Sequence, residues 1–165
     1  MKLLDNKSGL IVGATSGIGR AAALLFAKEG AKVAVNYFKS ESKANDVVAS
    51  IIVGGGSAKA FRADVSKIPE IERLVKEVMD EWGKVDILVN NAGVFHTVPV
   101  METTEEIWDA TLDLNLKGYF FAVKTLVPHW RKTGGGKVVN ISSIAGTGAF
   151  PNCPGYCASK GGVVN

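Results

Sequence analysis

A tyrosine and a lysine lie four residues apart in the segment "PGYCASKGGVVN", residues 154–165. On an α-helix, two residues with this spacing project from the same face, so their side chains would be neighbours. A phenol with its ordinary pKa of about 10 is a poor proton shuttle at neutral pH, but a nearby ammonium stabilises the phenolate and lowers that pKa. Tyr156 is therefore a candidate general acid and base, with Lys160 as the group that tunes it. From this pair alone, an exposed helical turn without chemistry is the alternative.

A second candidate segment is "VGATSGIGRAAALLFA", residues 12–27, which has glycines at positions 13, 17 and 19. Gly13 permits a sharp turn after a strand, Gly17 lets backbone amides approach a pyrophosphate, and Gly19 lets the following helix pack closely on the sheet. That helix presents its free N–H groups and the positive end of its dipole to the phosphates. The segment therefore predicts a dinucleotide site, and an ordinary strand-to-helix turn is the alternative.

Five short apolar runs have the character of strands that are buried on both faces of a parallel sheet. They cover residues 9–13, 32–36, 58–62, 85–90 and 137–141. Each is separated from the next by a stretch long enough for a helix, and parallel neighbours need such crossover connections. The alternation predicts an α/β fold: a Rossmann-like, doubly wound parallel sheet with helices on both faces. We expect residues 1–165 to form one domain.

The helical pattern is clearest before residue 83, where apolar residues recur at helical spacing. These residues are Ile71, Leu74, Val75, Val78, Met79 and Trp82. Ser66 is the predicted N-cap of this helix, and Gly83 is its predicted end. The sequence "TTEE" at residues 103–106 predicts a capping box that opens another helix. Helical length and composition are also found at residues 17–29, 41–52 and 116–132.

The composition argues against several functional classes. Lysine and arginine total 19 against 16 acidic residues, and the basic residues are scattered along the chain, which argues against nucleic acid or an anionic membrane as the main partner. The N-terminus lacks the apolar run of a signal peptide, and no stretch approaches the roughly 20 apolar residues of a membrane span, so we expect a soluble, cytoplasmic protein. Cys153 and Cys157 form no CxxC motif and have no distant Cys/His partners, so we expect two reduced thiols and no metal site.

The glycine spacing is G-x-x-x-G-x-G, which differs from the common dinucleotide fingerprint G-x-G-x-x-G. With this spacing the chain resembles the short-chain dehydrogenase/reductase family, and further motifs follow in the family's order. They are "DV" at residues 64–65, "NNAG" at 90–93, Asn115 within "LDLNLKG", "NISS" at 140–143 and "YCASK" at 156–160. One position departs from the pattern. Val12 stands where the family usually has threonine, so a hydroxyl that could tie the first strand to the "NNAG" loop is missing.

The resemblance implies a nicotinamide dinucleotide as cofactor. The residues expected to contact or surround it on this basis are Gly13, Thr15, Ser16, Gly17, Ile18, Gly19, Asn36, Tyr37, Lys39, Ser40, Asp64, Val65, Asn91, Ala92, Gly93, Tyr156 and Lys160. The cofactor preference depends on the end of the second strand, where an acidic residue would bind the ribose hydroxyls and repel a 2′-phosphate. Tyr37 occupies the acidic position of the family's NAD-preferring members and Lys39 follows it, so NADP(H) is favoured over NAD(H).

The resemblance also assigns four catalytic residues, Asn115, Ser143, Tyr156 and Lys160. Ser143 ends the fifth predicted strand and lies 13 residues before Tyr156 (156 − 143), as the family's catalytic serine does, with Ser142 as the neighbouring alternative. The Ser143 hydroxyl would hold a substrate carbonyl, and Asn115 would bind a water that leads to Lys160 and completes a proton relay. The expected reaction is reversible hydride transfer between NADP(H) and a carbonyl or secondary alcohol.

The apolar residues between positions 119 and 130 indicate core burial first, but the resemblance also implies a homo-oligomer built on this helix and on the one that begins near Tyr156. His96 and His129 are 33 residues apart (129 − 96) without clustered carboxylates or cysteines, so we expect them to be structural or surface residues.

The resemblance covers the whole chain but only the earlier part of the family pattern. We therefore expect the sheet to be incomplete at its C-terminal edge, and the family's substrate loop to lie beyond this sequence. The substrate stays open between a 3-oxoacyl thioester, a sugar and a small alcohol or ketone. Two functions from other classes also stay open: a nucleotide-binding fragment without turnover, and a structural or assembly module with a vestigial site.

Overall fold

The computed structural model describes residues 2–165 and contains one sheet of five parallel strands. The strands are β1 (Ser8–Val12), β2 (Lys32–Tyr37), β3 (Ser57–Arg62), β4 (Ile87–Asn90) and β5 (Lys137–Asn140). Their order in the sheet is β3-β2-β1-β4-β5. All five predicted strands are confirmed, with ends that differ by at most two residues from those expected.

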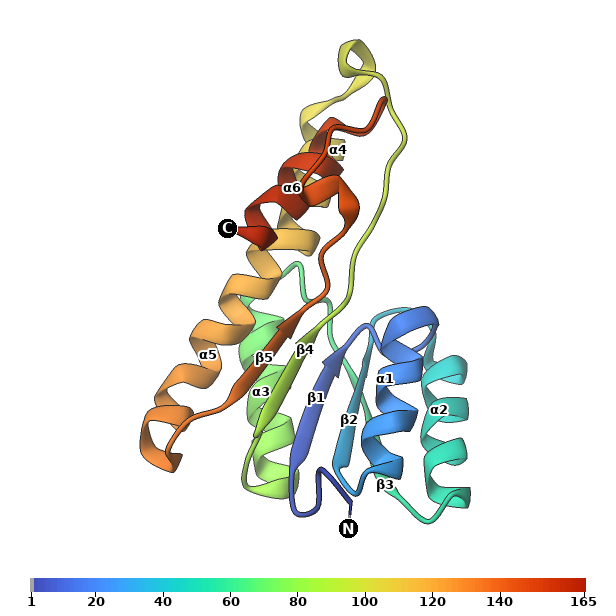
Figure 1. Ribbon diagram of the computed structural model, residues 1–165, viewed down its shortest axis with the longest axis vertical. Helices are drawn as coiled ribbons and strands as arrows, with labels where there is room; N and C mark the ends of the chain where they lie inside the picture. The colour runs from blue at the N-terminus through green and yellow to red at the C-terminus, as the bar shows by residue number, and fades with distance from the viewer. Residues whose placement is uncertain (1) are drawn as a thin grey trace.

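Six α-helices connect or follow the strands (Figure 1). They are α1 (Gly17–Lys28), α2 (Glu41–Val53), α3 (Ile68–Trp82), α4 (Glu105–Leu112), α5 (Gly118–Thr133) and α6 (Pro154–Val164). Short 3-10 helices η1 (Val100–Glu102) and η3 (Ile144–Gly146) lie in the connections, and a π-helical turn, η2 (Asp113–Lys117), joins α4 to α5. Within residues 2–165, no helix combines the length and the apolar character that crossing a membrane requires.

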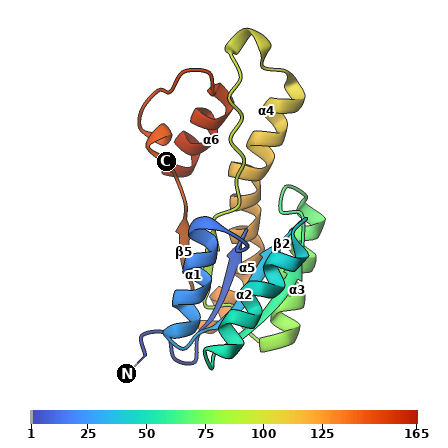
Figure 2. The same ribbon diagram turned by 90° about the vertical axis from the view of Figure 1, so that its right-hand side faces the viewer.

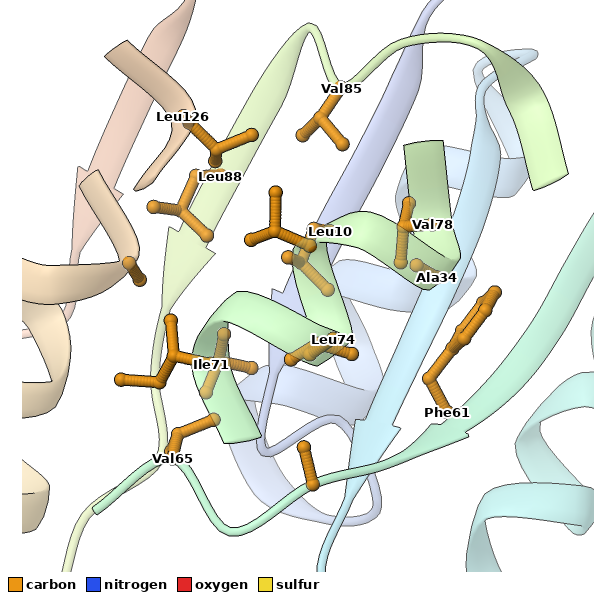
Figure 3. Close-up of a cluster of buried hydrophobic side chains, with 14 of the residues drawn as sticks. Leu10, Ala34, Phe61, Val65, Ile71, Leu74, Val78, Val85, Leu88 and Leu126 are labelled. Atoms are coloured by element: carbon orange, nitrogen blue, oxygen red, sulfur yellow. The ribbon is translucent and has the colours of Figure 1, made fainter. Parts of the chain in front are cut away.

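The helices cover both faces of the sheet, as predicted for a doubly wound fold (Figures 1 and 2). Leu10 and Val12 on β1 point to the face covered by α3 and α5, where Leu74 and Leu126 are also buried; Figure 3 shows this cluster. Ile11, between them in the sequence, points to the opposite face, which α1 and α2 cover. Because successive strand residues alternate between faces, β1 contributes to two separate cores.

The start of α3 differs from the prediction. Lys67 is the N-cap, and Ser66 lies outside the helix with its hydroxyl donating to Asp64 Oδ1 at 2.7 Å. The predicted N-cap is therefore wrong, because the Ser66 hydroxyl is hydrogen-bonded to Asp64, two residues earlier, instead of to an amide of the helix. The predicted end is confirmed: Gly83 has a φ of 73°, a left-handed conformation that favours glycine.

The predicted helix after residue 103 is confirmed, but its cap is one residue later than the capping box implies. Thr104 is the N-cap and accepts from the Ile107 amide at 3.4 Å, whereas the Thr103 hydroxyl donates to Pro99 O at 3.0 Å. The helix expected at 116–132 begins later, at Gly118, because residues 113–117 form the π-turn η2. Gly118 lies so close to Val65 O that a Cβ at this position would overlap it.

β5 is an open edge of the sheet. It pairs with β4, and all four of its residues are exposed, with Val138 at 39% and Val139 at 45%. This agrees with the expectation that the sheet is incomplete at its C-terminal edge. α4 and α6 lie side by side beyond the carboxyl ends of the strands (Figures 1 and 2), which is where the catalytic candidates are carried.

Candidate active site

A cavity of about 1300 Å³ opens at the carboxyl ends of the strands. Along the chain, β2 and β3 are added on one side of β1, and β4 and β5 are then added on the other side. The direction in which strands are added therefore reverses between β1 and β4. Ligands of open α/β sheets bind at this switch point. Fourteen of the predicted residues line the cavity: Gly13, Thr15, Ser16, Gly17, Ile18, Asn36, Lys39, Asp64, Val65, Asn91, Ala92, Gly93, Tyr156 and Lys160.

The glycine loop has the conformation that its sequence predicted. Gly13 and Gly17 have φ values of 71° and 52°, in the region that favours glycine. Gly19 does not line the cavity; instead it packs so closely that a Cβ would overlap Gly13 O and the Asn91 side chain. Asn91 itself donates to Gly13 O at 2.8 Å. The first turn of α1 is thereby fixed against β4, with the loop amides at the cavity wall.

Asn36 supports this loop from the other side. Its side chain is 2% exposed; it accepts from the Gly13 amide at 3.2 Å and donates to Phe61 O and Ala63 O at 3.3 Å each. One amide thus connects the ends of β1, β2 and β3. The residue was predicted for the cofactor, and the structure shows that it also positions the glycine loop.

The end of β2 is arranged differently from what the family resemblance implied for Tyr37. Tyr37 is buried, at 8% exposure, and does not line the cavity, and Ser40 is the N-cap of α2. Phe38 and Lys39 line the cavity, with the Lys39 ammonium 5.5 Å from the Phe38 ring centroid. Arg62 lies against the same ring, at 5.7 Å. The side chains that reach the cavity at the end of β2 are therefore Asn36 and the two that follow Tyr37.

Tyr156 and Lys160 both line the cavity from α6. Lys160 is 3% exposed, and its ammonium donates to Ile141 O at 2.6 Å. The same ammonium lies 5.9 Å from the Tyr156 ring centroid and 5.2 Å from that of Tyr119. Burial lowers the pKa of Lys160, because an ammonium removed from water is disfavoured. The predicted pairing of the two side chains on one helical face is confirmed.

Tyr119 is a neighbour of this pair that the sequence did not single out. It belongs to the apolar stretch of α5, yet it is 3% exposed and faces Lys160, while Phe120 beside it is 62% exposed. Its hydroxyl lies 3.5 Å from Ile141 O, the carbonyl that also binds the lysine. Burial first, and Tyr156 second, raise the pKa of Tyr119 well above its ordinary value, so it stays a neutral phenol.

Asn115 is completely buried inside the π-turn. Its Oδ1 accepts from the Val94 amide at 2.8 Å, and its Nδ2 donates to Val94 O at 2.9 Å and to Ser159 Oγ at 3.2 Å. Ser159 in turn donates to Tyr156 O at 2.8 Å. Asn115 therefore joins the chain after β4 to the helix that carries Tyr156 and Lys160.

The two serines after β5 have different partners. The Ser142 hydroxyl lines the cavity and donates to Lys160 O at 3.2 Å. Ser143 does not line the cavity; its Oγ accepts from the Ala145 amide at 3.2 Å and caps η3. The structure thus brings Tyr156, Lys160 and Ser142 to the cavity wall and holds Ser143 one residue further along.

The segment after β4 closes the wall next to Tyr156. Phe95 packs edge-on against the Tyr156 ring, with centroids 4.8 Å apart. His96 lines the cavity, and its Nδ1 lies 3.0 Å from Thr111 Oγ1. His129 lies elsewhere, on α5.

Known proteins share this sequence pattern and this fold. The family described as short chain dehydrogenase matches residues 7–165, which is nearly the whole chain and includes every residue of the site. The chain belongs to the short-chain dehydrogenase family.

Its relatives in this family are longer. The chain is 42% identical over 159 residues to a 3-oxoacyl-[acyl-carrier-protein] reductase of Staphylococcus epidermidis, covering 96% of this chain and 65% of that protein. It is 40% identical over 164 residues to a 3-oxoacyl-[acyl-carrier-protein] reductase of Synechocystis, covering 99% and 66%. The crystal structure of a metagenomic short-chain oxidoreductase in complex with NADP superposes with a TM-score of 0.93 at 31% identity, over 98% of this chain and 73% of that one.

Several lining residues were not among the predicted site residues. They are Phe38, Ala63, Ser66, Lys67, Val94, Phe95, His96, Glu106, Asp109, Ala110, Asp113, Leu114 and Ile141, whereas Ser142 was predicted only as the alternative to Ser143. Eight of them lie within six residues after the end of β2, β3, β4 or β5, so their position near a strand's carboxyl end was a usable signal. The α4 residues had no such signal, because only the three-dimensional path of the chain brings α4 over the sheet.

Val12, which stands where the family usually has threonine, lies beside a buried hydrogen-bond acceptor, Asn90 Oδ1, that has no donor in the described part of the chain. Val12 is paired in register with Asn90, and both are at most 2% exposed. Asn90 Nδ2 donates to Asn140 Oδ1 at 2.9 Å, but within residues 2–165 Asn90 Oδ1 has no hydrogen-bond partner. A buried polar atom without a partner costs free energy of folding.

Val12→Thr is expected to raise the free energy of unfolding by about 1 kcal/mol, because the new hydroxyl can donate to Asn90 Oδ1 across the strand pair. Urea denaturation of both proteins measures the change. The matched control is Val35→Thr, since Val35 is also fully buried but lies on the opposite face of the sheet. There the hydroxyl is expected to cost about 1–3 kcal/mol. Equal destabilisation of the two variants would contradict the assignment of the missing donor.

Proposed function

We propose that this chain holds the cofactor-binding and proton-handling parts of an oxidoreductase that transfers a hydride between NADP(H) and a carbonyl or secondary alcohol. The observation that carries the proposal is the position of Lys160. Its ammonium is buried in the wall of the cavity that the glycine loop opens, next to the ring of Tyr156. A buried titratable group beside a second one in a large cavity is typical of a catalytic site.

The described residues fit a dinucleotide. The loop amides of residues 13–18, at the N-terminus of α1, would hold the pyrophosphate. Lys39 and Asp64 follow β2 and β3 and would lie at the adenosine end, while Tyr156 and Lys160 would lie at the nicotinamide end. The bound nicotinamide supplies or accepts the hydride.

Tyr156 would give its phenolic proton to the carbonyl oxygen during reduction and take it back during oxidation. Lys160 would stabilise the phenolate through its positive charge, which the protein holds in place by its bond to Ile141 O. We propose Ser143 rather than Ser142 as the group that orients the carbonyl, although Ser142 is the one that lines the cavity in this structure. Ser143 Oγ accepts from the Ala145 amide and keeps its own proton to donate, whereas the Ser142 proton is used by Lys160 O.

Asn115 would support proton transfer by fixing the positions of the residues around the site. Its side chain holds the Val94 backbone on one side and Ser159 on the other, so the wall near Phe95 and the helix near Tyr156 cannot move independently. A water bridge from Asn115 to Lys160, as the family resemblance implies, would complete the relay.

The substrate class follows from the relatives only as a proposal. The matching curated relatives include 3-oxoacyl-[acyl-carrier-protein] reductases, and this chain spans 65% of the length of the Staphylococcus epidermidis protein. A 3-oxoacyl thioester is therefore the first substrate to test, followed by small ketones and sugars.

The exposed Phe120 on α5 and the open strand β5 suit association with further protein, and we propose a homo-oligomer, which sedimentation velocity tests.

The test of the proposed function is a titration of the chain with NADPH and NADH, followed by an assay for carbonyl reduction. Binding of NADPH together with turnover supports the oxidoreductase. Binding without turnover supports a nucleotide-binding fragment, which would keep the cavity and lose the reaction. If neither dinucleotide binds, the chain is a structural module and the proposal is wrong.

Lys39→Glu is expected to lower the ratio of NADPH to NADH affinity about tenfold to a hundredfold, because Lys39 lines the cavity where a 2′-phosphate would lie, and a charge-assisted hydrogen bond contributes roughly 1.5–3 kcal/mol. Fluorescence titration with both dinucleotides measures the ratio. Lys43→Glu makes the same change of charge on the exposed side of α2, outside the cavity, and is expected to leave the ratio unchanged. A ratio that falls equally in both variants would show a general charge effect and contradict a contact at Lys39.

A further inference from the structure

The chain has two cysteines, and both lie at the first turn of the helix that carries Tyr156. Cys153 is the N-cap of α6, and the Cys157 amide donates to Cys153 O at 3.0 Å. Their Sγ atoms are 3.7 Å apart, and both thiols are within reach of Phe150 O, at 3.5 and 3.9 Å. The sequence predicted two unconnected reduced thiols. The structure has them reduced and in contact.

The backbone geometry allows a bond between them. The Cys153 to Cys157 hydrogen bond closes one helical turn, so the two Cα atoms are separated by about 6 Å, from four residues at 1.5 Å of rise each. Disulfides occur at Cα separations of about 4.4–6.8 Å. Cys153 has the non-helical backbone angles φ −147° and ψ 53°, so its Cβ is free of the direction that an α-helix would impose.

The two thiols differ in access and in protonation. Cys153 is 1% exposed, whereas Cys157 is half-buried. Burial, together with the neighbouring Cys157 thiol, raises the pKa of Cys153, which keeps it protonated at neutral pH. An oxidant from solvent therefore reaches the sulfur of Cys157 first. The buried Cys153 sulfur lies in contact with it.

We infer that Cys153 and Cys157 are a modification site at which a hydroperoxide produces a reversible intramolecular disulfide. In the first step Cys157–SH attacks the peroxide, the O–O bond breaks, and the products are Cys157–SOH and an alcohol or water. In the second step the Cys153 sulfur attacks the sulfenic sulfur; the S–S bond forms and water leaves. The two thiols lose two electrons, and the peroxide gains them.

This disulfide would act on the site through α6. It would span the helix's first turn, within which Tyr156 lies, and it would remove both thiol donors from Phe150 O. Cys157 is only half-buried, and exposed disulfides are among those that dithiols reduce easily. The first turn of α6 is therefore expected to exchange its amide hydrogens differently in the oxidised and reduced chains. The inference concerns the thiols alone and does not depend on hydride transfer.

The experiment treats the folded chain with hydrogen peroxide, blocks remaining thiols with N-ethylmaleimide, and measures the intact mass. Because the chain has only these two cysteines, a monomer that has lost two hydrogens and takes up no maleimide contains the Cys153–Cys157 bond. We expect this species in the wild type, with full return to two maleimide adducts after dithiothreitol. Hydrogen exchange of the peptide spanning residues 150–160 should differ between the oxidised and the reduced forms.

Cys157→Ser is the control, because Cys157 is half-buried and serine keeps a donor for Phe150 O. This variant should lose no hydrogens as a monomer, and its folding is checked by its unfolding curve in urea. Cys153→Ser should be oxidised at Cys157 to a sulfenic or sulfinic acid, with added oxygen instead of lost hydrogen. The inference is overturned if the wild type only gains oxygen atoms, forms only dimers, or keeps both thiols free, and equally if the exchange of residues 150–160 is unchanged.

Discussion

Tyr156→Phe is expected to lower kcat for carbonyl reduction by a factor of about 10²–10⁴, the usual contribution of a positioned acid or base, while the affinity for NADPH stays unchanged. The substitution removes only the phenolic oxygen. The ring can still pack edge-on against Phe95, and Lys160 can keep its bond to Ile141 O. The variant is therefore expected to fold and to bind NADPH as the wild type does, and the lower kcat is expected to reflect slower proton transfer.

The measurement is steady-state reduction of a ketone or 3-oxoacyl thioester at saturating NADPH, together with a binding titration. Tyr119→Phe removes the same atom from the other tyrosine beside Lys160 and serves as the comparison. Tyr119 does not line the cavity, and its hydroxyl is directed at Ile141 O, so we expect less than about a tenfold loss. If Tyr156→Phe kept most of its kcat, Tyr156 would not be the proton donor.

The sequence was most informative where function requires a short, contiguous motif. The glycine loop and the Tyr156–Lys160 pair each lie within one turn or one loop, so residue type and spacing alone predicted their arrangement. The doubly wound parallel sheet was also accessible, because parallel neighbours need helical crossover connections of one handedness. These parts of the fold depend on local pattern and on general rules of connection.

The parts that sequence did not predict depend on contacts between distant segments. Ser66 looked like a helix cap, but its hydroxyl bonds to Asp64 and the helix starts later. The π-turn around Asn115 has no local sequence signal, and the structure shows Asn115 meeting Val94 and Ser159 from other elements. Propensity ranks residues in a helix but does not report such tertiary partners.

The residues at the end of β2 show the same limit on a finer scale. The family position that discriminates between cofactors falls on Tyr37, yet this side chain is turned into the protein, and Phe38 and Lys39 line the cavity in its place. The family resemblance indicates which position should matter. Strand residues alternate between the two faces, and Tyr37 belongs to the core under α1 and α2 together with Val35.

Gly19→Ala is expected to weaken NADPH binding about tenfold to a hundredfold. A Cβ on Gly19 would overlap Gly13 O and the Asn91 side chain, so the first turn of α1 must move away from β4. Overpacking of this kind costs roughly 1–3 kcal/mol, and each 1.4 kcal/mol is a factor of about ten in affinity. The displaced turn is the one whose amides would face the pyrophosphate, so the loss appears in binding as well as in stability.

Dinucleotide titration and urea denaturation of the same preparation separate the two effects. Gly148→Ala is the matched control: a Cβ there would be 3.7 Å from Ile144 O, an ordinary contact, in a segment outside the cavity. It is expected to leave the NADPH affinity unchanged. An unchanged affinity in Gly19→Ala would mean that the turn at the start of α1 can shift without disturbing the phosphates. In that case the amides of residues 13–18 would not be the pyrophosphate site, and the dinucleotide would have to be held by the other end of the cavity, around Lys39 and Asp64.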